Sequence, residues 1–219
     1  MTAGEPRRAG LGALRRLAVP EPPAAPQPER CEMCAVELGD RHGHLADTGE
    51  HRLLCVCRPC YLLFAPRGAG RGRYRAVGEE VRTVEDVRID DAQWEALRIP
   101  VDLAFAFRQT GADRLLMFYP GPGGATESLL DLEAWSGIAE ANPVLDVLEP
   151  DVEAVLLRRH DDRFSCYLVP VDVCYELVGL VRLHWTGLAG GPEVWHRLDA
   201  FFDGLDRRSS RVHRAGSGV

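Results

Sequence analysis

Three features of the sequence predict an α+β fold. Two Cys-x-x-Cys pairs lie near the N-terminus, at Cys31 and Cys34 and at Cys57 and Cys60. Beyond them, apolar runs of strand length come in pairs joined by short polar turns, and amphipathic helical patterns lie between and after these pairs. We therefore expect a small N-terminal four-cysteine metal-binding finger, followed by a larger domain with an antiparallel sheet and C-terminal helices.

Composition and charge favour a soluble globular protein and argue against one that binds nucleic acid or membranes. The chain has 219 residues, of which 46% are hydrophobic and 27% charged, as in soluble globular proteins. The net charge of −7 argues against nucleic acid or an anionic membrane as the main partner, since both require basic surfaces. Every basic side chain is an arginine, so no lysine nucleophile, Schiff base or phosphate-binding lysine exists.

No apolar run has the length of a signal peptide or of the roughly 20 residues that span a bilayer. The expected location is the cytoplasm, where the seven cysteines would be reduced. We then expect the cysteines to be metal ligands or buried thiols rather than disulfides.

Shifts in composition divide the chain. Residues 1–28 are rich in proline and alanine and are expected to be disordered, and residues 29–66 form the finger. A joint rich in glycine and arginine at 67–73 marks the boundary, after which residues 74–208 form the α+β domain and residues 209–219 a disordered tail.

The four cysteines are the strongest signal. Two Cys-x-x-Cys turns each direct two sulfurs to one centre, and together they complete a tetrahedron with sulfurs about 2.3 Å from a zinc ion. The predicted ligands are Cys31, Cys34, Cys57 and Cys60. A segment this small cannot bury enough core to fold alone, but metal binding contributes roughly 10–16 kcal/mol in comparable peptides.

The residues between the two pairs predict the type of finger. Residues 43–46 and 52–56 have the pattern of two strands around a turn at 47–50, and Pro59 marks the start of a helix. Knuckle, hairpin and short helix is the order of a treble-clef finger. A zinc ribbon is the alternative, and it would make residues 58–64 a strand.

This segment also offers other candidate ligands, and iron is an alternative to zinc as the bound ion. Cys55 is expected to be a buried thiol beneath the site, with a ligand as the alternative. His42 and His44 are expected to support the hairpin or the ligands, and His44 is a candidate additional ligand. Iron in a rubredoxin-like centre uses the same four thiolates. Rubredoxin knuckles usually have glycine after the second cysteine, where Ala35 and Tyr61 stand here, which favours zinc.

The larger domain begins with two predicted strand pairs. Residues 101–107 and 115–119 form the first pair, with a turn that contains Gly111. Residues 152–157 and 164–169 form the second, joined by a polar turn at 160–162.

Three helices are predicted from apolar residues at helical spacing. Leu129, Leu132, Trp135 and Ile138 define the first, which Ser128 and Asp131 would begin as a capping box. The other two stripes comprise Val173, Leu177, Leu180, Val181 and Trp185, and then Val194, Leu198, Phe201, Phe202 and Leu205. The four tryptophans, Trp94, Trp135, Trp185 and Trp195, are expected in the core.

Weaker candidates have plainer interpretations. The segment Gly121–Ser128 lacks a Walker lysine and is expected to be a strand-to-helix connection, with anion binding at residues 126–128 as the alternative. Cys166 and Cys174 are expected to be buried thiols rather than a redox pair, and Glu176 a solvent-facing carboxylate. No serine–histidine–acid arrangement is evident.

Seven segments of the chain resemble an actinobacterial family of unknown function: 30–34 (RCEMC), 42–45 (HGHL), 54–60 (LCVCRPC), 118–120 (FYP), 124–128 (GATES), 166–170 (CYLVP) and 174–179 (CYELVG). Genes of this family often lie beside those of uptake nickel–iron (NiFe) hydrogenases and their maturation factors. The resemblance implies an accessory to hydrogenase assembly or electron transfer, with hydrogenase subunits or maturation factors as partners. A closed four-cysteine site beside a domain without a catalytic signature favours a non-enzymatic metal-binding accessory protein. The alternative is a rubredoxin-like iron module that transfers electrons.

Overall fold

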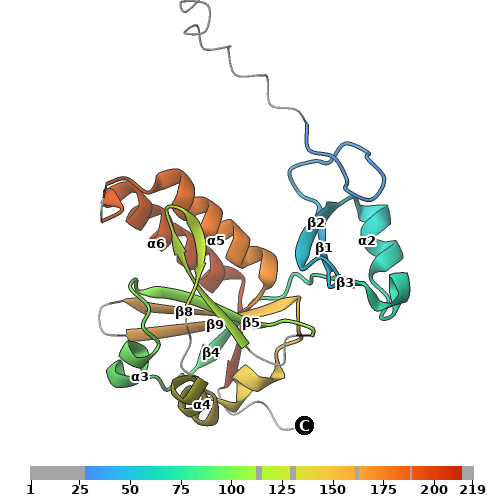
Figure 1. Cartoon of the computed structure of the whole chain (residues 1–219). Helices are drawn as coiled ribbons and strands as arrows, with labels where there is room; N and C mark the ends of the chain where they lie inside the picture. The colour runs from blue at the N-terminus through green and yellow to red at the C-terminus, as the bar shows by residue number, and fades with distance from the viewer. Residues whose placement is uncertain (1–27, 112–114, 129–131, 161–162, 188, 214–219) are drawn as a thin grey trace, which may run out of the picture.

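A computed structural model describes residues 28–111, 115–128, 132–160, 163–187 and 189–213 (Figure 1). The described residues form two sheets, one of three strands and one of seven, with helices beside both. The mixed α and β content and the predominantly antiparallel pairing agree with the predicted class. In Figure 1 the small sheet and α2 (Arg58–Phe64) lie to one side of the larger sheet and its helices.

The small sheet is built on the predicted hairpin. Its strands are β1 (Gly43–Asp47), β2 (Arg52–Val56) and β3 (Tyr74–Ala76), in the order β2-β1-β3 with antiparallel pairing throughout. The hairpin is confirmed, and α2 follows it where Pro59 predicts a helix. The third strand was not predicted. It has three residues, too few for an alternating pattern, and it comes from the segment assigned to the start of the larger domain.

The larger sheet contains both predicted strand pairs. Its strands run in the order β10-β4-β9-β8-β5-β6-β7, and every pair is antiparallel except β10 with β4. The strands are β4 (Arg82–Glu85), β5 (Leu103–Arg108), β6 (Leu115–Gly121), β7 (Gly124–Glu127), β8 (Glu153–His160), β9 (Arg163–Pro170) and β10 (Ser210–His213). Pairs β5–β6 and β8–β9 are confirmed. Asp161 and Asp162 of the second turn lie outside the described residues.

Three strands of this sheet differ from expectation. Residues 210–213, assigned to a disordered tail, form the edge strand β10 beside β4. Residues 124–127, assigned to a strand-to-helix connection, form the opposite edge strand β7. Edge strands carry few buried apolar residues, so neither β10 nor β7 has the alternation by which a strand is recognised in sequence. Strand β4 was not predicted either, because its four residues are too few to show a clear alternation.

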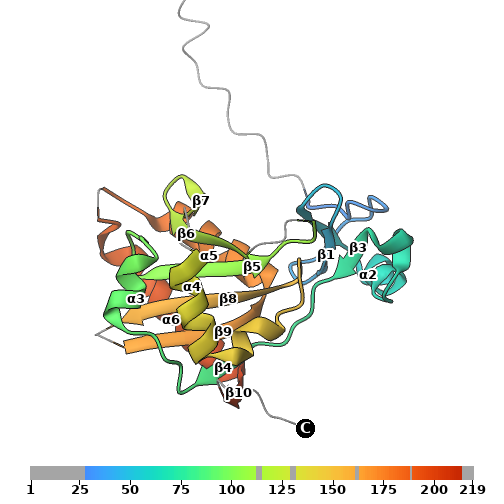
Figure 2. The same cartoon turned by 60° about the horizontal axis from the view of Figure 1, so that its bottom comes forward.

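Helices cover both faces of the larger sheet (Figures 1 and 2). They are α3 (Asp91–Ala96), α4 (Leu132–Ala141), α5 (Val171–His184) and α6 (Gly191–Arg208), with single turns η1 (Ala69–Gly72) and η2 (Pro143–Val147). Ala154 and Leu156 of β8 pack with α5 and α6. The residues between and after them, Val155 and Leu157, pack with α3 and α4. This alternation gives the sheet two buried faces.

The predicted helices are found, with some differences in detail. Trp94 and Trp135 are buried as expected and Trp185 is partly buried. Trp195 is exposed, so its assignment to the core was wrong. Leu129 and Asp131 lie outside the described residues. No helix in the described ranges is both long and apolar enough to cross a membrane.

The small sheet contacts the larger one through a compact apolar cluster. Ala46 and Val77 from the small-sheet side pack against Val152 and Val171, which lie beside β8 and at the start of α5. Polar contacts also join the two parts: Arg75 of β3 donates to Glu149 at 2.6 Å and to the carbonyl of Pro150 at 2.7 Å. These contacts bring the cysteine-rich segment next to the N-terminus of α5.

Candidate metal centre

The first cysteine pair lies in a tight turn. The backbone N–H of Cys31 donates to the Val36 carbonyl at 2.8 Å, and the N–H of Ala35 donates to the Cys31 carbonyl at 2.7 Å. Ala35 has a φ of 62°, the left-handed conformation that glycine adopts more readily. The turn therefore keeps the conformation expected of a metal-binding knuckle although no glycine follows Cys34.

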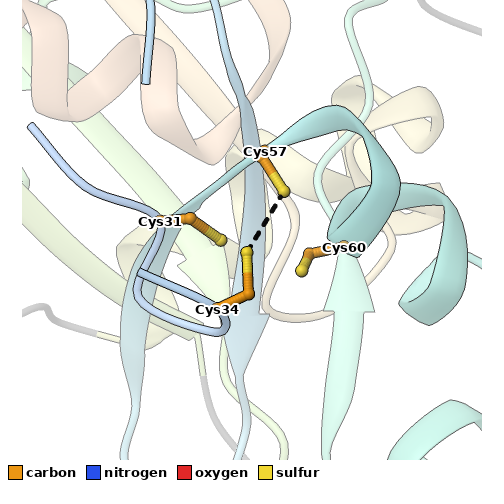
Figure 3. A group of neighbouring side chains, drawn as sticks. All are labelled: Cys31, Cys34, Cys57 and Cys60. Atoms are coloured by element: carbon orange, nitrogen blue, oxygen red, sulfur yellow. Dashed lines mark hydrogen bonds between the residues drawn. The ribbon is translucent and has the colours of Figure 1, made fainter. Parts of the chain in front are cut away.

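The second pair lies where β2 passes into α2. Cys57 is the N-cap residue of α2 and accepts at its carbonyl from the N–H of Tyr61 at 2.9 Å. Pro59 lies in the first turn, where its missing N–H costs nothing. The helical turn brings Cys60 to the same side as Cys57, and both sulfurs point toward the first pair (Figure 3).

The structure brings the four predicted cysteines together. Their sulfurs all lie within 4.8 Å of one another, and those of Cys34 and Cys57 are 3.6 Å apart. In a tetrahedral zinc site with bonds of about 2.3 Å, neighbouring sulfurs are roughly 3.8 Å apart. Cys31 is buried, Cys57 and Cys60 are partly buried, and Cys34 is exposed. The arrangement fits one metal ion with four sulfur ligands.

The pKa values of the thiols depend on burial, on backbone hydrogen bonds and on the neighbouring sulfurs. Burial opposes ionisation of Cys31, but the backbone N–H groups of Cys57 and Met33 outweigh it and lower the Cys31 pKa to about 6. Burial, followed by the neighbouring sulfurs of Cys34 and Cys57, raises the pKa of Cys60 to about 12. Burial and the closeness of the other sulfurs thus both oppose ionisation of Cys60. A divalent ion removes that repulsion and allows all four to ionise.

Charged residues that the sequence analysis did not single out stabilise the first cysteine knuckle and the β1–β2 turn. Glu32 accepts from the backbone N–H of Cys55 and from Arg52, both at 2.7 Å, which fastens the first knuckle to β2. At the far end of the hairpin the buried carboxylate of Asp47 accepts two bonds from Arg73, at 2.7 and 2.9 Å. No local pattern marks these pairs, since their partners are distant along the chain.

A glycine of the hairpin is also part of the framework. A Cβ atom on Gly43 would lie 2.6 Å from the Tyr61 ring of α2. The Tyr61 hydroxyl donates to the carbonyl of Val77 at 3.0 Å. The close approach of β1 to α2, which presents Cys60, therefore requires glycine at position 43.

Cys55, His42 and His44 form a group of their own. One ligand atom from each lies within 4.8 Å of the others, and neither Cys55 nor His44 belongs to the group of four cysteines. Cys55 is partly buried, and burial together with the carboxylate of Glu29 raises its pKa to about 12. The Nδ1 atom of His44 lies 2.8 Å from Asp172 at the start of α5.

The remaining candidates have structural explanations. Cys166 and Cys174 are both fully buried, and burial raises the pKa of each thiol far above its ordinary value. Cys166 packs in the core on the α3–α4 face of the sheet and Cys174 on the α5–α6 face, so they do not form a redox pair. Glu176 is exposed, as predicted.

The glycine-rich segment Gly121–Ser128 is a hairpin and its exit, not a strand-to-helix connection. Thr126 and Glu127 belong to β7. Ser128 is buried and donates its hydroxyl to the carbonyl of Leu97 at 3.1 Å. The predicted helix N-terminus for an anion is therefore not formed by these residues.

Comparison with known proteins gives one match. The model of a family described as "Family of unknown function (DUF5947)" matches residues 30–209, which include all four cysteines and every strand except β10. No curated protein and no solved structure matches the chain.

Proposed function

The chain belongs to DUF5947, a family of unknown function, and we propose that it is a non-enzymatic metal-binding accessory protein. One zinc ion is held by Cys31, Cys34, Cys57 and Cys60. The observation that carries this proposal is the gathering of four sulfurs within 4.8 Å of one another. Four protein ligands fill a tetrahedral ion and leave no position for substrate, which is the pattern of a structural zinc site.

The elements around the sulfurs favour a treble-clef finger. The first knuckle, the β1–β2 hairpin and α2 follow one another in the treble-clef order. A zinc ribbon would have a strand at residues 58–64, where α2 lies. The finger then comprises residues 29–66 together with β3, and the α+β domain carries the remaining strands. The free energy of metal binding is what folds this small unit.

Metal analysis and a visible spectrum of the purified chain test the nature of the ion. The proposal predicts a colourless protein with zinc bound at the four cysteines. The variant Cys34→Ser is expected to lose that zinc, whereas Cys166→Ser, which alters a thiol distant from the centre, retains it. A red protein whose colour disappears on reduction would contradict the proposal and establish a rubredoxin-like iron centre.

Exposed apolar side chains on the finger support a role in protein contact. Leu62 and Leu63 of α2 are 54% and 68% exposed, and they follow the ligand Cys60 after one intervening residue, Tyr61. Exposed leucines beside one another in a protein with many charged residues favour an interaction surface. We take the partner to be a subunit or maturation factor of a NiFe hydrogenase in the cytoplasm, which rests on the family resemblance of the sequence.

Co-purification with a hydrogenase large subunit tests this partner. Leu62→Asp with Leu63→Asp is expected to abolish the association and to leave zinc content unchanged. The matched control is Leu183→Asp on α5, where the leucine is 81% exposed but lies away from the finger. If neither the wild-type chain nor the control retains the hydrogenase subunit, the partner assignment is wrong.

A further inference from the structure

We propose that His42, His44 and Cys55 form a second metal site, separate from the four cysteines, that takes a divalent transition ion such as zinc. The three residues come from the same hairpin. His44 lies directly opposite Cys55 in the β1–β2 register, and His42 precedes β1 by one residue. Residues two apart on a strand share a face, so both imidazoles lie on the side of the hairpin where Cys55 projects.

The ligand atoms are close enough to be bridged by one ion. They lie within 4.8 Å of one another, and the centroids of the two imidazole rings are 5.0 Å apart in an edge-to-face arrangement. With bonds of about 2.0–2.3 Å, the ligand atoms of a tetrahedral ion are roughly 3.3–3.8 Å apart. A movement of about 1 Å by side chains at the surface of the hairpin closes that difference. Two imidazoles and a thiolate are ligands typical of zinc.

Hydrogen bonds prepare both histidines to bind through Nε2. Nδ1 of His42 lies 3.1 Å from the carbonyl of Gly39, and Nδ1 of His44 lies 2.8 Å from Oδ2 of Asp172. A carbonyl and a carboxylate only accept, so in the neutral ring Nδ1 carries the proton and Nε2 has the free lone pair. Metal-binding histidines almost always have this second hydrogen bond.

The Nε2 atom of His42 gives the most specific indication. It is buried and has no hydrogen-bond partner within the part of the chain that the structure describes. A buried nitrogen left without a partner costs roughly 1–3 kcal/mol. A metal ion bound to this nitrogen removes the cost, which provides a reason for the orientation of the ring.

The surroundings favour a cation and leave it accessible. Both histidines line a hollow of about 620 Å³ that opens between the finger and α5. The charged residues on its walls are four carboxylates, those of Asp40, Glu79, Asp172 and Glu176, and two arginines, Arg41 and Arg208. Cys55 does not line this hollow, so an ion there is reached from the histidine side. Three protein ligands leave the fourth position of a tetrahedral ion for water or another ligand, unlike the filled four-cysteine centre.

Asp172 gives the site a link to the larger domain. It lies in the first turn of α5, whereas its partner His44 lies in β1, and the bond between them spans 128 residues of sequence. An ion on His44 would strengthen this bond, because a bound cation makes the imidazole a better donor. Occupancy of the second site therefore stabilises the contact between finger and α5.

Cadmium-113 NMR of the full-length chain loaded with Cd²⁺ tests the proposal, since the resonance position separates an all-sulfur site from one with nitrogen ligands. Two resonances are expected, one for four sulfurs and one for mixed nitrogen and sulfur ligands. His44→Ala should remove only the mixed resonance, and Asp172→Asn should weaken Cd²⁺ affinity at that site by about 10- to 100-fold. The control His196→Ala, at an exposed histidine of α6, should keep both.

The outcomes distinguish the two sites. A single all-sulfur resonance with one Cd²⁺ per wild-type chain overturns the second site and leaves the four-cysteine centre intact. Two resonances that both survive His44→Ala overturn it as well. Loss of the all-sulfur resonance in the wild-type chain would instead contradict the proposed function. Because Asp172→Asn changes no ligand, a specific loss of affinity there cannot come from a missing ligand or from failure of the finger to fold.

Discussion

The ion pair between Asp47 and Arg73 gives a prediction whose size follows from the structure. Asp47 is 2% exposed and accepts two bonds from Arg73, together with the backbone N–H groups of Gly49 at 3.0 Å and Glu50 at 3.2 Å. The Arg73 guanidinium is the main cause that lowers the Asp47 pKa from 3.8 to about 2. These bonds anchor the β1–β2 turn to the chain that leads into β3.

The lowered pKa of Asp47 gives the size of its contribution to the free energy of unfolding. Each pKa unit corresponds to about 1.4 kcal/mol, so the ionised Asp47 contributes at most about 2.5 kcal/mol to folding. The Arg73 side chain is 47% exposed, and solvent screening reduces this to about 1–2 kcal/mol. Asp47→Asn should therefore lower the free energy of unfolding by about 1–2 kcal/mol at neutral pH. Arg73→Gln should cost a similar amount, and the double variant little more.

The pH dependence has a definite sign. Because the pKa of Asp47 is lower in the folded state, its contribution is complete above the unfolded pKa of about 3.8 and is lost as the pH falls through about 2. Urea unfolding of zinc-loaded chains, followed by far-ultraviolet circular dichroism at a series of pH values, measures it. The difference between wild type and Asp47→Asn should be constant from neutral pH to about pH 4 and shrink below.

The comparison with a matched variant makes this test decisive. Asp203→Asn removes an exposed carboxylate of α6 and should change stability by less than about 0.5 kcal/mol. Acid also releases metal from thiolates, but it does so in every variant, so the difference isolates Asp47. A difference of zero at neutral pH, or one that persists unchanged to pH 2, would refute the reasoning.

Two further predictions concern packing and thiol reactivity. Gly43→Ala should destabilise the finger by about 1–3 kcal/mol, because its Cβ would lie 2.6 Å from the Tyr61 ring. The control Gly39→Ala should leave stability unchanged, because nothing lies within 4 Å of its added Cβ. Chelator-induced zinc release at increasing urea compares the two variants, and equal release would contradict the packing described. After zinc removal, a thiol reagent should modify the finger cysteines in the native chain but Cys166 and Cys174 only in denaturant, as mass spectrometry of peptides would show. Rapid native labelling of Cys166 would mean that the α3–α4 face opens.

The local pattern was sufficient for much of the fold. The hairpin of β1 and β2, strands β5, β6, β8 and β9, and helices α5 and α6 each have their own periodicity or turn residues. The four cysteines were equally visible, since spacing alone brings the two sulfurs of each pair to one side. The structure adds that both pairs meet at one centre.

The rest depends on contacts that no local pattern records. Strand β10 has one apolar residue, Val212, and it exists as a strand because β4 offers a free edge beside it. His44 and Cys55 share the hairpin face of Ala46 and Leu53, which packs against the larger domain. The opposite face, with Leu45, Leu54 and Val56, packs against the cysteine cluster. The bond from His44 to Asp172, across 128 residues, depends on tertiary packing and leaves no trace in either segment.

The central claim is that Cys31, Cys34, Cys57 and Cys60 together hold one zinc ion. Zinc-edge X-ray absorption of the His44→Ala chain with one equivalent of zinc tests it most directly, because that variant lacks a ligand of the second group. The predicted result is a shell of four sulfurs at about 2.3 Å with no nitrogen or oxygen neighbour. A shell that includes nitrogen or oxygen at about 2.0–2.1 Å would contradict the claim.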